Sequence, residues 1–175
     1  MKTAIIYATT EGQTRKIARF CADRLADAGD SVELIQAEDA SDIDLSRFDG
    51  AILAASVHIM RYQKEMVEFA TAQADALNGL RTLFLSVSLA AAGDDPEDWE
   101  GLGKCVAEFS AKTGWTPGQV EHVAGAFKFS EYDFFRSWAM RWIAAQKGQE
   151  VSPGEDREYT DWAALGATLD AWRAG

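Results

Sequence analysis

Residues 5–14, Ile-Ile-Tyr-Ala-Thr-Thr-Glu-Gly-Gln-Thr, change abruptly from an apolar run to hydroxyl side chains and a single glycine. A helical pattern of apolar residues follows from Gln13 onward. A strand, a short polar loop and a helix start place unpaired backbone N–H groups and the positive end of a helix dipole at the loop. The stretch therefore predicts an anion site formed by Thr9, Thr10, Glu11, Gly12, Gln13 and Thr14.

The composition of this loop narrows the kind of anion. It contains no lysine, which a nucleoside-triphosphate loop of the GxxxxGK type requires, and it lacks the glycine spacing of a dinucleotide site. Gly12 lets the backbone approach an anion closely, and the threonine hydroxyls can donate hydrogen bonds. A single phosphate monoester held by neutral donors is the ligand that suits these residues, while an ordinary strand-to-helix turn is the alternative.

The same ten residues resemble a known family. The order aliphatic, aliphatic, aromatic, any, Thr, any, any, Gly, any, Thr is the N-terminal phosphate signature of flavodoxins, and residues 5–14 match it throughout. Ala18 fits the usual continuation, whereas Cys21 stands where an aliphatic residue is usual. The resemblance implies that the loop binds the phosphate of FMN.

Length and composition indicate one globular domain spanning residues 1–175. The chain is 47% hydrophobic and carries a formal net charge of −11, which argues against nucleic-acid binding because no basic surface meets a phosphate backbone. Cys21 and Cys105 lie far apart without a CxxC motif, so we expect buried free thiols rather than a disulfide or a metal site. No apolar run reaches transmembrane length and no signal peptide is recognised, so a cytoplasmic location is expected.

Apolar runs and helical patterns alternate along the rest of the chain. The predicted strands cover residues 2–8, 31–36, 51–55, 82–87 and 120–127, and helices are predicted over 13–28, about 66–77, from an Asp95 cap to Gly114, over 132–146 and after a Thr160 cap. This order predicts an α/β fold. It is a doubly wound five-stranded parallel sheet in the flavodoxin-like order 2-1-3-4-5, with an extra helical segment after the fifth strand.

In such a sheet, ligands bind beyond the carboxyl ends of the strands, where three loops meet. Besides the phosphate loop, these are residues 56–62 and 86–92, which the resemblance places as the two walls around the flavin ring. We expect His58 either to contact the flavin or to be a solvated loop residue, and His122 to be structural. No catalytic side chain and no metal site is predicted. The expected wall residues are Ser56, Val57, His58, Ile59, Ser86, Val87, Ser88, Leu89 and Ala90.

The first wall departs from the usual flavodoxin pattern. Residues 56–62 contain no glycine, whereas typical flavodoxins have one there. The departure argues against the peptide flip used by one-electron carriers and favours two-electron chemistry. The acidic stretch 93–98 either caps a helix or takes part in partner selection.

A closer resemblance covers nearly the full chain, and its most specific part lies in the C-terminal third. Ala54-Ala55-Ser56, Val123-Ala124-Gly125-Ala126, Tyr132-Asp133 and Glu158-Tyr159-Thr160-Asp161-Trp162 are similar to flavodoxin-type, menaquinone-dependent protoporphyrinogen oxidases. The resemblance implies an FMN enzyme that oxidises protoporphyrinogen IX and passes electrons to a quinone at the inner face of the cell membrane. The aromatic stretch between Phe134 and Ile143 packs on the sheet or contacts a membrane or partner. The alternative is an electron-transfer flavodoxin without its own substrate, which meets a redox-protein partner.

Overall fold

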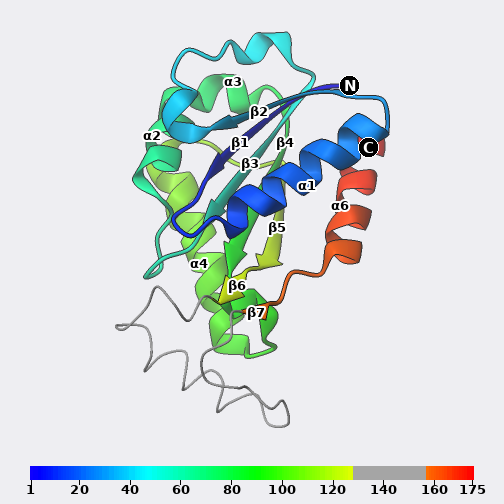
Figure 1. Cartoon of the computed structure of the whole chain (residues 1–175). Helices are drawn as coiled ribbons and strands as arrows, with labels where there is room; N and C mark the ends of the chain where they lie inside the picture. Colours follow the sequence, from blue (N-terminus) through cyan, green and yellow to red (C-terminus); the bar gives the residue numbers. More distant parts are fainter. Residues whose placement is uncertain (128–156) are drawn as a thin grey trace.

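Five parallel strands form the central sheet, in the spatial order β2-β1-β3-β4-β5 (Figure 1). The structure is a computed structural model that describes residues 1–127 and 157–175. The order confirms the predicted doubly wound arrangement. The strands are β1 Lys2–Ala8, β2 Ser31–Gln36, β3 Gly50–Ser56, β4 Arg81–Ser88 and β5 Gln119–Ala124.

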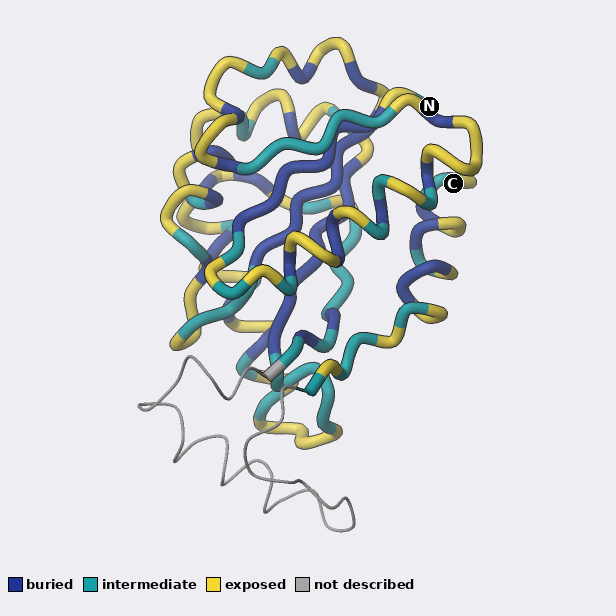
Figure 2. The backbone as a smooth tube through the Cα atoms, in the orientation of Figure 1, coloured by how far each residue is buried: buried dark blue, intermediate teal, exposed yellow. Residues whose placement is uncertain are grey.

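Helices cover both faces of the sheet. One face packs against α1 (Gln13–Asp27) and α6 (Trp162–Ala174), and the other against α2 (Lys64–Ala72), α3 (Ala74–Asn78) and α4 (Pro96–Thr113). Short 3-10 turns span Ala37–Asp39 (η1), Leu45–Arg47 (η2) and Ala90–Ala92 (η3). Because both faces are covered, β1, β3 and β4 are buried along nearly their whole length, which explains their continuous apolar runs (Figure 2).

The described residues correct the predicted elements at three points. The single helix expected over about 66–77 is divided at Gln73 into α2 and α3. The N-cap of α6 is Asp161, whose carboxylate accepts a hydrogen bond from the Ala164 N–H at 2.9 Å. Thr160 does not cap the helix: its hydroxyl donates to the Ala124 carbonyl oxygen and accepts a hydrogen bond from the Gln13 side-chain amide instead.

The fifth strand also ends earlier than predicted. β5 stops at Ala124, and the Gly125 N–H donates to the Ser88 carbonyl oxygen at 2.9 Å. The next two residues form β6 (Ala126–Phe127), which pairs antiparallel with β7 (Arg157–Glu158) rather than extending the sheet. The predicted helix over 132–146 and the stretch between Phe134 and Ile143 lie outside the described residues. Within the described part of the chain, no helix is long and apolar enough to span a membrane.

Both cysteines are free and buried, as predicted. Cys21 is on the buried face of α1, and burial raises the pKa of its thiol to about 12. Cys105 is on the buried face of α4, where burial and the nearby Glu108 raise the pKa of its thiol. Since the thiolate is the reactive form, both side chains serve as packing groups rather than nucleophiles.

A buried carboxylate ties the C-terminal helix to the sheet. Asp30, which precedes β2, has a side chain that is only 1% exposed, and its Oδ2 lies 2.8 Å from Arg173 Nε on α6. The Arg173 guanidinium donates hydrogen bonds to both carboxylate oxygens and thereby lowers the pKa of Asp30, outweighing the opposing effect of desolvation. The pair therefore stabilises the fold only while Asp30 is ionised.

Replacing the Asp30 carboxylate by an amide should remove its pH-dependent contribution to the free energy of unfolding. Asp30→Asn should lower the urea midpoint of unfolding at pH 7, because Arg173 loses its charged partner. A carboxylate whose folded pKa is depressed stabilises the protein above its unfolded pKa and loses that contribution as the pH falls through the folded value. The difference from the unsubstituted protein should therefore begin to shrink as the pH falls below about 4, the ordinary pKa of an aspartate, and should disappear only below the depressed pKa of Asp30 in the folded protein. Asp23→Asn, at an exposed position of α1, is the control; an Asp30→Asn deficit that persists unchanged at low pH would contradict this account.

Candidate functional site

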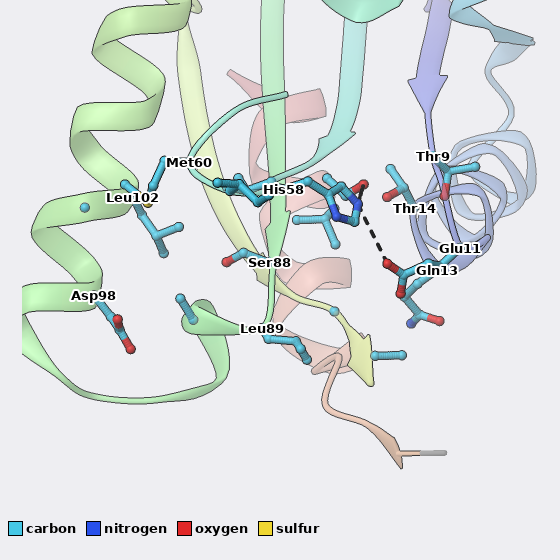
Figure 3. Close-up of a pocket in the computed structure, with 18 of the residues that line it drawn as sticks. Thr9, Glu11, Gln13, Thr14, His58, Met60, Ser88, Leu89, Asp98 and Leu102 are labelled. Atoms are coloured by element: carbon cyan, nitrogen blue, oxygen red, sulfur yellow. Dashed lines mark hydrogen bonds and ion pairs between the residues drawn. The ribbon is translucent and has the colours of Figure 1, made fainter. Parts of the chain in front are cut away.

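The carboxyl ends of β1, β3 and β4 open into a cavity of about 770 Å³ (Figure 3). The loop after β1 and the start of α1 form one end, the loops after β3 and β4 form the middle, and the first turns of α4 form the other end. The lining residues are Thr9, Glu11, Gln13, Thr14, Ser56, Val57, His58, Ile59, Met60, Val87, Ser88, Leu89, Ala90, Glu97, Asp98, Gly101, Leu102, Gly125 and Ala126.

The start of α1 presents unused hydrogen-bond donors to this cavity. Gly12 adopts a left-handed conformation with φ +91°, and its N–H donates to Thr9 Oγ1 at 2.9 Å. No side chain caps the helix, and its first intrahelical bond runs from the Lys16 N–H to the Gly12 carbonyl oxygen. The N–H groups of residues 13–15 therefore lie outside the hydrogen-bond ladder of the helix.

Thr14 adds a side-chain donor at the same place. Its residue exposure is 1%, and its Oγ1 has no hydrogen-bond partner among the described residues. A buried hydroxyl without a partner is unfavourable unless something else binds it. Together with the uncapped helix end, it marks this end of the cavity as a site for an acceptor group.

The loop after β3 is held in an unusual backbone conformation. His58 and Arg61 exchange two backbone hydrogen bonds, of 2.7 and 3.0 Å, around Ile59 and Met60. Both central residues have positive φ, +46° and +60°, as in the two-residue hairpin turn that normally carries Asn-Gly. Ile59 is 76% exposed and Met60 is 51% exposed. This turn gives the cavity an apolar rim at the cost of backbone strain.

The His58 side chain connects the loop after β3 to the loop after β1. Its Nε2 lies 3.8 Å from Glu11 Oε1 and 3.3 Å from Ser56 Oγ (Figure 3). Gln63, which the sequence did not single out, holds Ser56 in turn: its amide nitrogen donates to Ser56 Oγ, and its Oε1 accepts the Ser56 N–H at 3.2 Å. The sequence left open whether His58 contacts a flavin or is a solvated loop residue. Its side chain lines the cavity and is one-third exposed, so it is not freely solvated.

Three of the predicted site residues are not among the residues that line the cavity. Ser86 lies on the α4 side of β4, is fully buried, and its hydroxyl shares a hydrogen bond of 2.8 Å with the phenol of Tyr62. Thr10 is exposed and its hydroxyl accepts a hydrogen bond from Gln63, while Gly12 shapes the loop through its backbone. The other predicted residues of all three loops lie along the lining.

The sequence did not predict the residues of α4 that line the far end of the cavity. Glu97, Asp98, Gly101 and Leu102 come from the first turns of α4, and Met60 packs across Gly101, where an added Cβ would lie 3.2 Å from Met60 Cε. Partial burial, together with Asp95 and Glu97, raises the pKa of Asp98. The Asp95-Pro96 helix start could have predicted this part of the lining, because it places the first turn of α4 directly after the loop that follows β4.

His122 does not line the cavity. It lies on β5, where burial lowers the pKa of its imidazole. Its ring packs edge-on against Trp99 of α4, with ring centroids 5.5 Å apart. These contacts agree with the structural role expected for His122.

Comparison with known proteins gives the family. A family model described as "Flavodoxin domain" matches residues 4–153. The chain belongs to the flavodoxin family. Among solved structures, oxidised flavodoxin 2 from Bacillus cereus has a TM-score of 0.60 at 16% identity, with 99% of each chain covered, and a flavodoxin of Streptococcus pneumonia TIGR4 has a TM-score of 0.57 at 21% identity, also with 99% of each covered. At these identities the likeness establishes the fold alone.

Two relatives of the chain carry the name of a dehydrogenase. The chain is 26% identical over 162 residues to "Protoporphyrinogen IX dehydrogenase [quinone]" of Escherichia coli K12, covering 93% of this chain and 89% of the relative. A protein of the same name from Leishmania major is 26% identical over 165 residues, covering 94% of this chain and 71% of the relative.

The α1 end of the cavity offers hydrogen-bond donors that could hold the phosphate of a flavin mononucleotide. The donors are neutral: backbone N–H groups at the start of α1 and the buried Thr14 hydroxyl. Glu11, the carboxylate nearest to them in sequence, lies beside His58. The unpaired Thr14 hydroxyl is the observation that fits a bound phosphate best, because phosphate oxygens are strong acceptors.

Thr14→Val tests whether this hydroxyl is reserved for an anion. Without ligand, the variant should be more stable by about 1 kcal/mol, because a buried hydroxyl without a partner is replaced by an isosteric methyl group. Inorganic phosphate should raise the melting temperature of the unsubstituted protein but have little effect on the variant.

Thr3→Val is the matched control. Thr3 is also buried with an unpartnered hydroxyl, but it lies at the other end of β1, away from the cavity lining. This control should keep the full phosphate response. A Thr14→Val protein that still responds to phosphate like the unsubstituted protein would show that the anion binds elsewhere.

The strained turn after β3 gives a second prediction. Replacing Ile59-Met60 by Asn-Gly should raise the free energy of unfolding by about 1–2 kcal/mol, because these residues tolerate positive φ. Chemical denaturation measures the gain. Ile59→Val, which keeps a β-branched residue at the strained position, should give no such gain, and an Asn-Gly variant of unchanged stability would argue that the turn is unstrained.

Proposed function

We propose that this protein is an FMN-dependent oxidoreductase that transfers electrons from a reduced organic substrate to a quinone. The observation that carries the proposal is the buried, unpartnered Thr14 hydroxyl beside the uncapped start of α1, at one end of a large cavity on the carboxyl edge of the sheet. Membership of the flavodoxin family supports a flavin as the ligand of this cavity.

Residues from all three loops would hold the cofactor. Thr9, Thr14 and the N–H groups of the first turn of α1 bind the phosphate, with Gln13 and Glu11 beside them. The small and apolar side chains Val57, Val87, Leu89 and Ala90 form the walls for a flat ring. When bound, FMN supplies the two-electron chemistry of the reaction.

His58 is the side chain of this site best placed to hold or release a proton. Its Nε2 faces the cavity, and Glu11 lies near enough to balance the charge of a protonated imidazole. Ser56 and Gln63 fix the position of the ring through the hydrogen bonds between them. The turn at Ile59 and Met60 adds apolar side chains to the cavity lining next to His58.

For the substrate, we propose a protoporphyrinogen of the kind named for the Escherichia coli and Leishmania relatives, oxidised at the inner face of the cell membrane. In this proposal the substrate lies beside the flavin at the far end of the cavity, which is lined by Met60, Leu102, Glu97 and Asp98. A quinone, which is uncharged, suits the apolar part of this end.

A second candidate function is electron transfer without a bound substrate. Ile59, Met60 and Trp99 are the large hydrophobic residues exposed among the described residues, and they come from the turn at the cavity mouth and from the acidic start of α4. An apolar patch beside acidic residues is suited to docking a basic redox partner.

Two measurements on the full chain separate these functions. The protein should bind FMN, seen as quenching of flavin fluorescence, and Thr14→Val should weaken binding about 10- to 100-fold, as expected for the loss of a hydrogen bond to a charged group. The FMN-loaded protein should then form fluorescent porphyrin from protoporphyrinogen IX under anaerobic conditions only when a naphthoquinone is added.

The possible results lead to different conclusions. FMN binding without turnover, combined with rapid one-electron exchange with a flavodoxin reductase, would favour the carrier. A protein that binds neither FMN nor another flavin would refute both functions. The loaded Thr3→Val variant should turn over like the unsubstituted protein, which controls for the general effect of a Thr→Val change.

A further inference from the structure

A short segment far away in the sequence is attached to the start of α1. Residues 158–162, Glu-Tyr-Thr-Asp-Trp, run from the end of β7 to the start of α6, and we call them the 158–162 strap. In Figure 1 the chain leading into α6 runs from β7 along the lower end of the sheet, the same end at which α1 begins. The strap is one of the segments similar to the protoporphyrinogen oxidases, but none of its residues lines the cavity.

Thr160 is the central contact of the strap. Its hydroxyl donates to the Ala124 carbonyl oxygen at 2.6 Å and accepts a hydrogen bond from the Gln13 side-chain amide at 2.9 Å. The neighbouring Tyr159 N–H donates to the Gly125 carbonyl oxygen at 3.0 Å. Thr160 thus connects the end of β5 to the first residue of α1, which itself lines the cavity.

A second contact lies one helical turn further along α1. Glu158 Oε2 lies 2.6 Å from Lys16 Nζ, and its other oxygen accepts a hydrogen bond from Trp162 Nε1 at 2.8 Å. The Trp162 ring packs against Phe20 with centroids 4.9 Å apart. Partial burial opposes ionisation of Glu158, but the hydrogen bonds from Lys16, Trp162 and Gln13 outweigh it and lower the pKa of this carboxyl.

These contacts lie where the helix has least support of its own. The start of α1 lacks a side-chain cap and follows Gly12, which has φ +91°. The buried face that anchors the helix to the sheet begins at Thr14 and continues through Ile17, Ala18 and Cys21. The side chains of Gln13 and Lys16 point instead to the strap, so the strap fixes the first turn from the opposite side.

We propose that the 158–162 strap is a positioning element for the phosphate-binding end of α1, with Thr160 as its key residue. The inference rests on the proposed FMN function. Thr160 acts through Gln13 and does not itself line the cavity. Its effect should therefore concern the phosphate of the cofactor and not the flavin ring.

Comparison of FMN with riboflavin isolates that effect, because riboflavin lacks the phosphate. Thr160→Val in the full chain should weaken FMN binding roughly 3- to 10-fold while changing riboflavin binding less than about twofold, since the loss of one neutral hydrogen bond is worth about 1 kcal/mol. Thr160→Ser, which keeps the hydroxyl, should restore the preference for FMN. Equilibrium dissociation constants from flavin fluorescence give both values.

Asp161→Ala is the matched control. It removes the N-cap of α6 next to Thr160 but leaves the contacts of Thr160 and Glu158 with α1 in place, so it should lower the melting temperature without changing the FMN-to-riboflavin affinity ratio. Should Thr160→Val lose affinity for both flavins equally, or for neither, the strap is only structural and the inference is wrong. An unsubstituted protein that binds FMN no more tightly than riboflavin overturns the phosphate site of the proposed function, and the inference with it.

Discussion

The unpaired N–H groups at the start of α1 are the constraint on which the site depends. They cannot be satisfied within the helix, and no side chain caps them, so they face the cavity at the end of β1. β1 lies between β2 and β3, and the chain leaves it on one face of the sheet to return as β2. The loops after β1 and β3 therefore diverge, and the crevice between them opens directly over the helix start.

Charge is distributed unevenly along this crevice. Its α1 end offers neutral donors, whereas the α4 end carries Glu97 and Asp98. No lysine or arginine occurs among the described residues of the lining, so a phosphate held at the α1 end depends on dipoles and hydroxyl groups rather than on a countercharge. His58 is the one lining side chain that can become positively charged, and it lies beside a carboxylate.

Sequence reasoning predicted the sheet and the strand-to-helix turn after β1 well because both depend on local patterns. Continuous apolar runs at β1, β3 and β4 reflect burial on two faces, and the hydroxyl-rich break after Ala8 marks the turn into α1. The incorrect predictions concern residues whose positions depend on tertiary contacts. Ser86 and Ser88 share one face of β4, yet Tyr62 covers the first, while the second lies at the strand end and lines the cavity. Thr160 and Asp161 are both N-cap residue types, but the Thr160 hydroxyl is bound to the Ala124 carbonyl oxygen and the Gln13 amide, and Asp161 caps the helix.

The pairing of β6 with β7 has a consequence for how this fold can vary. Phe127 and Arg157 are antiparallel partners, so the two ends of the segment 128–156 are held at neighbouring points. Loop-closure entropy grows slowly with length, by about 0.6 kcal/mol for each doubling. A segment of almost any length can therefore be inserted or exchanged between these two residues without displacing β5 or α6. The fold thus contains a natural insertion point, where new specificity can be acquired while the sheet and its loops stay the same.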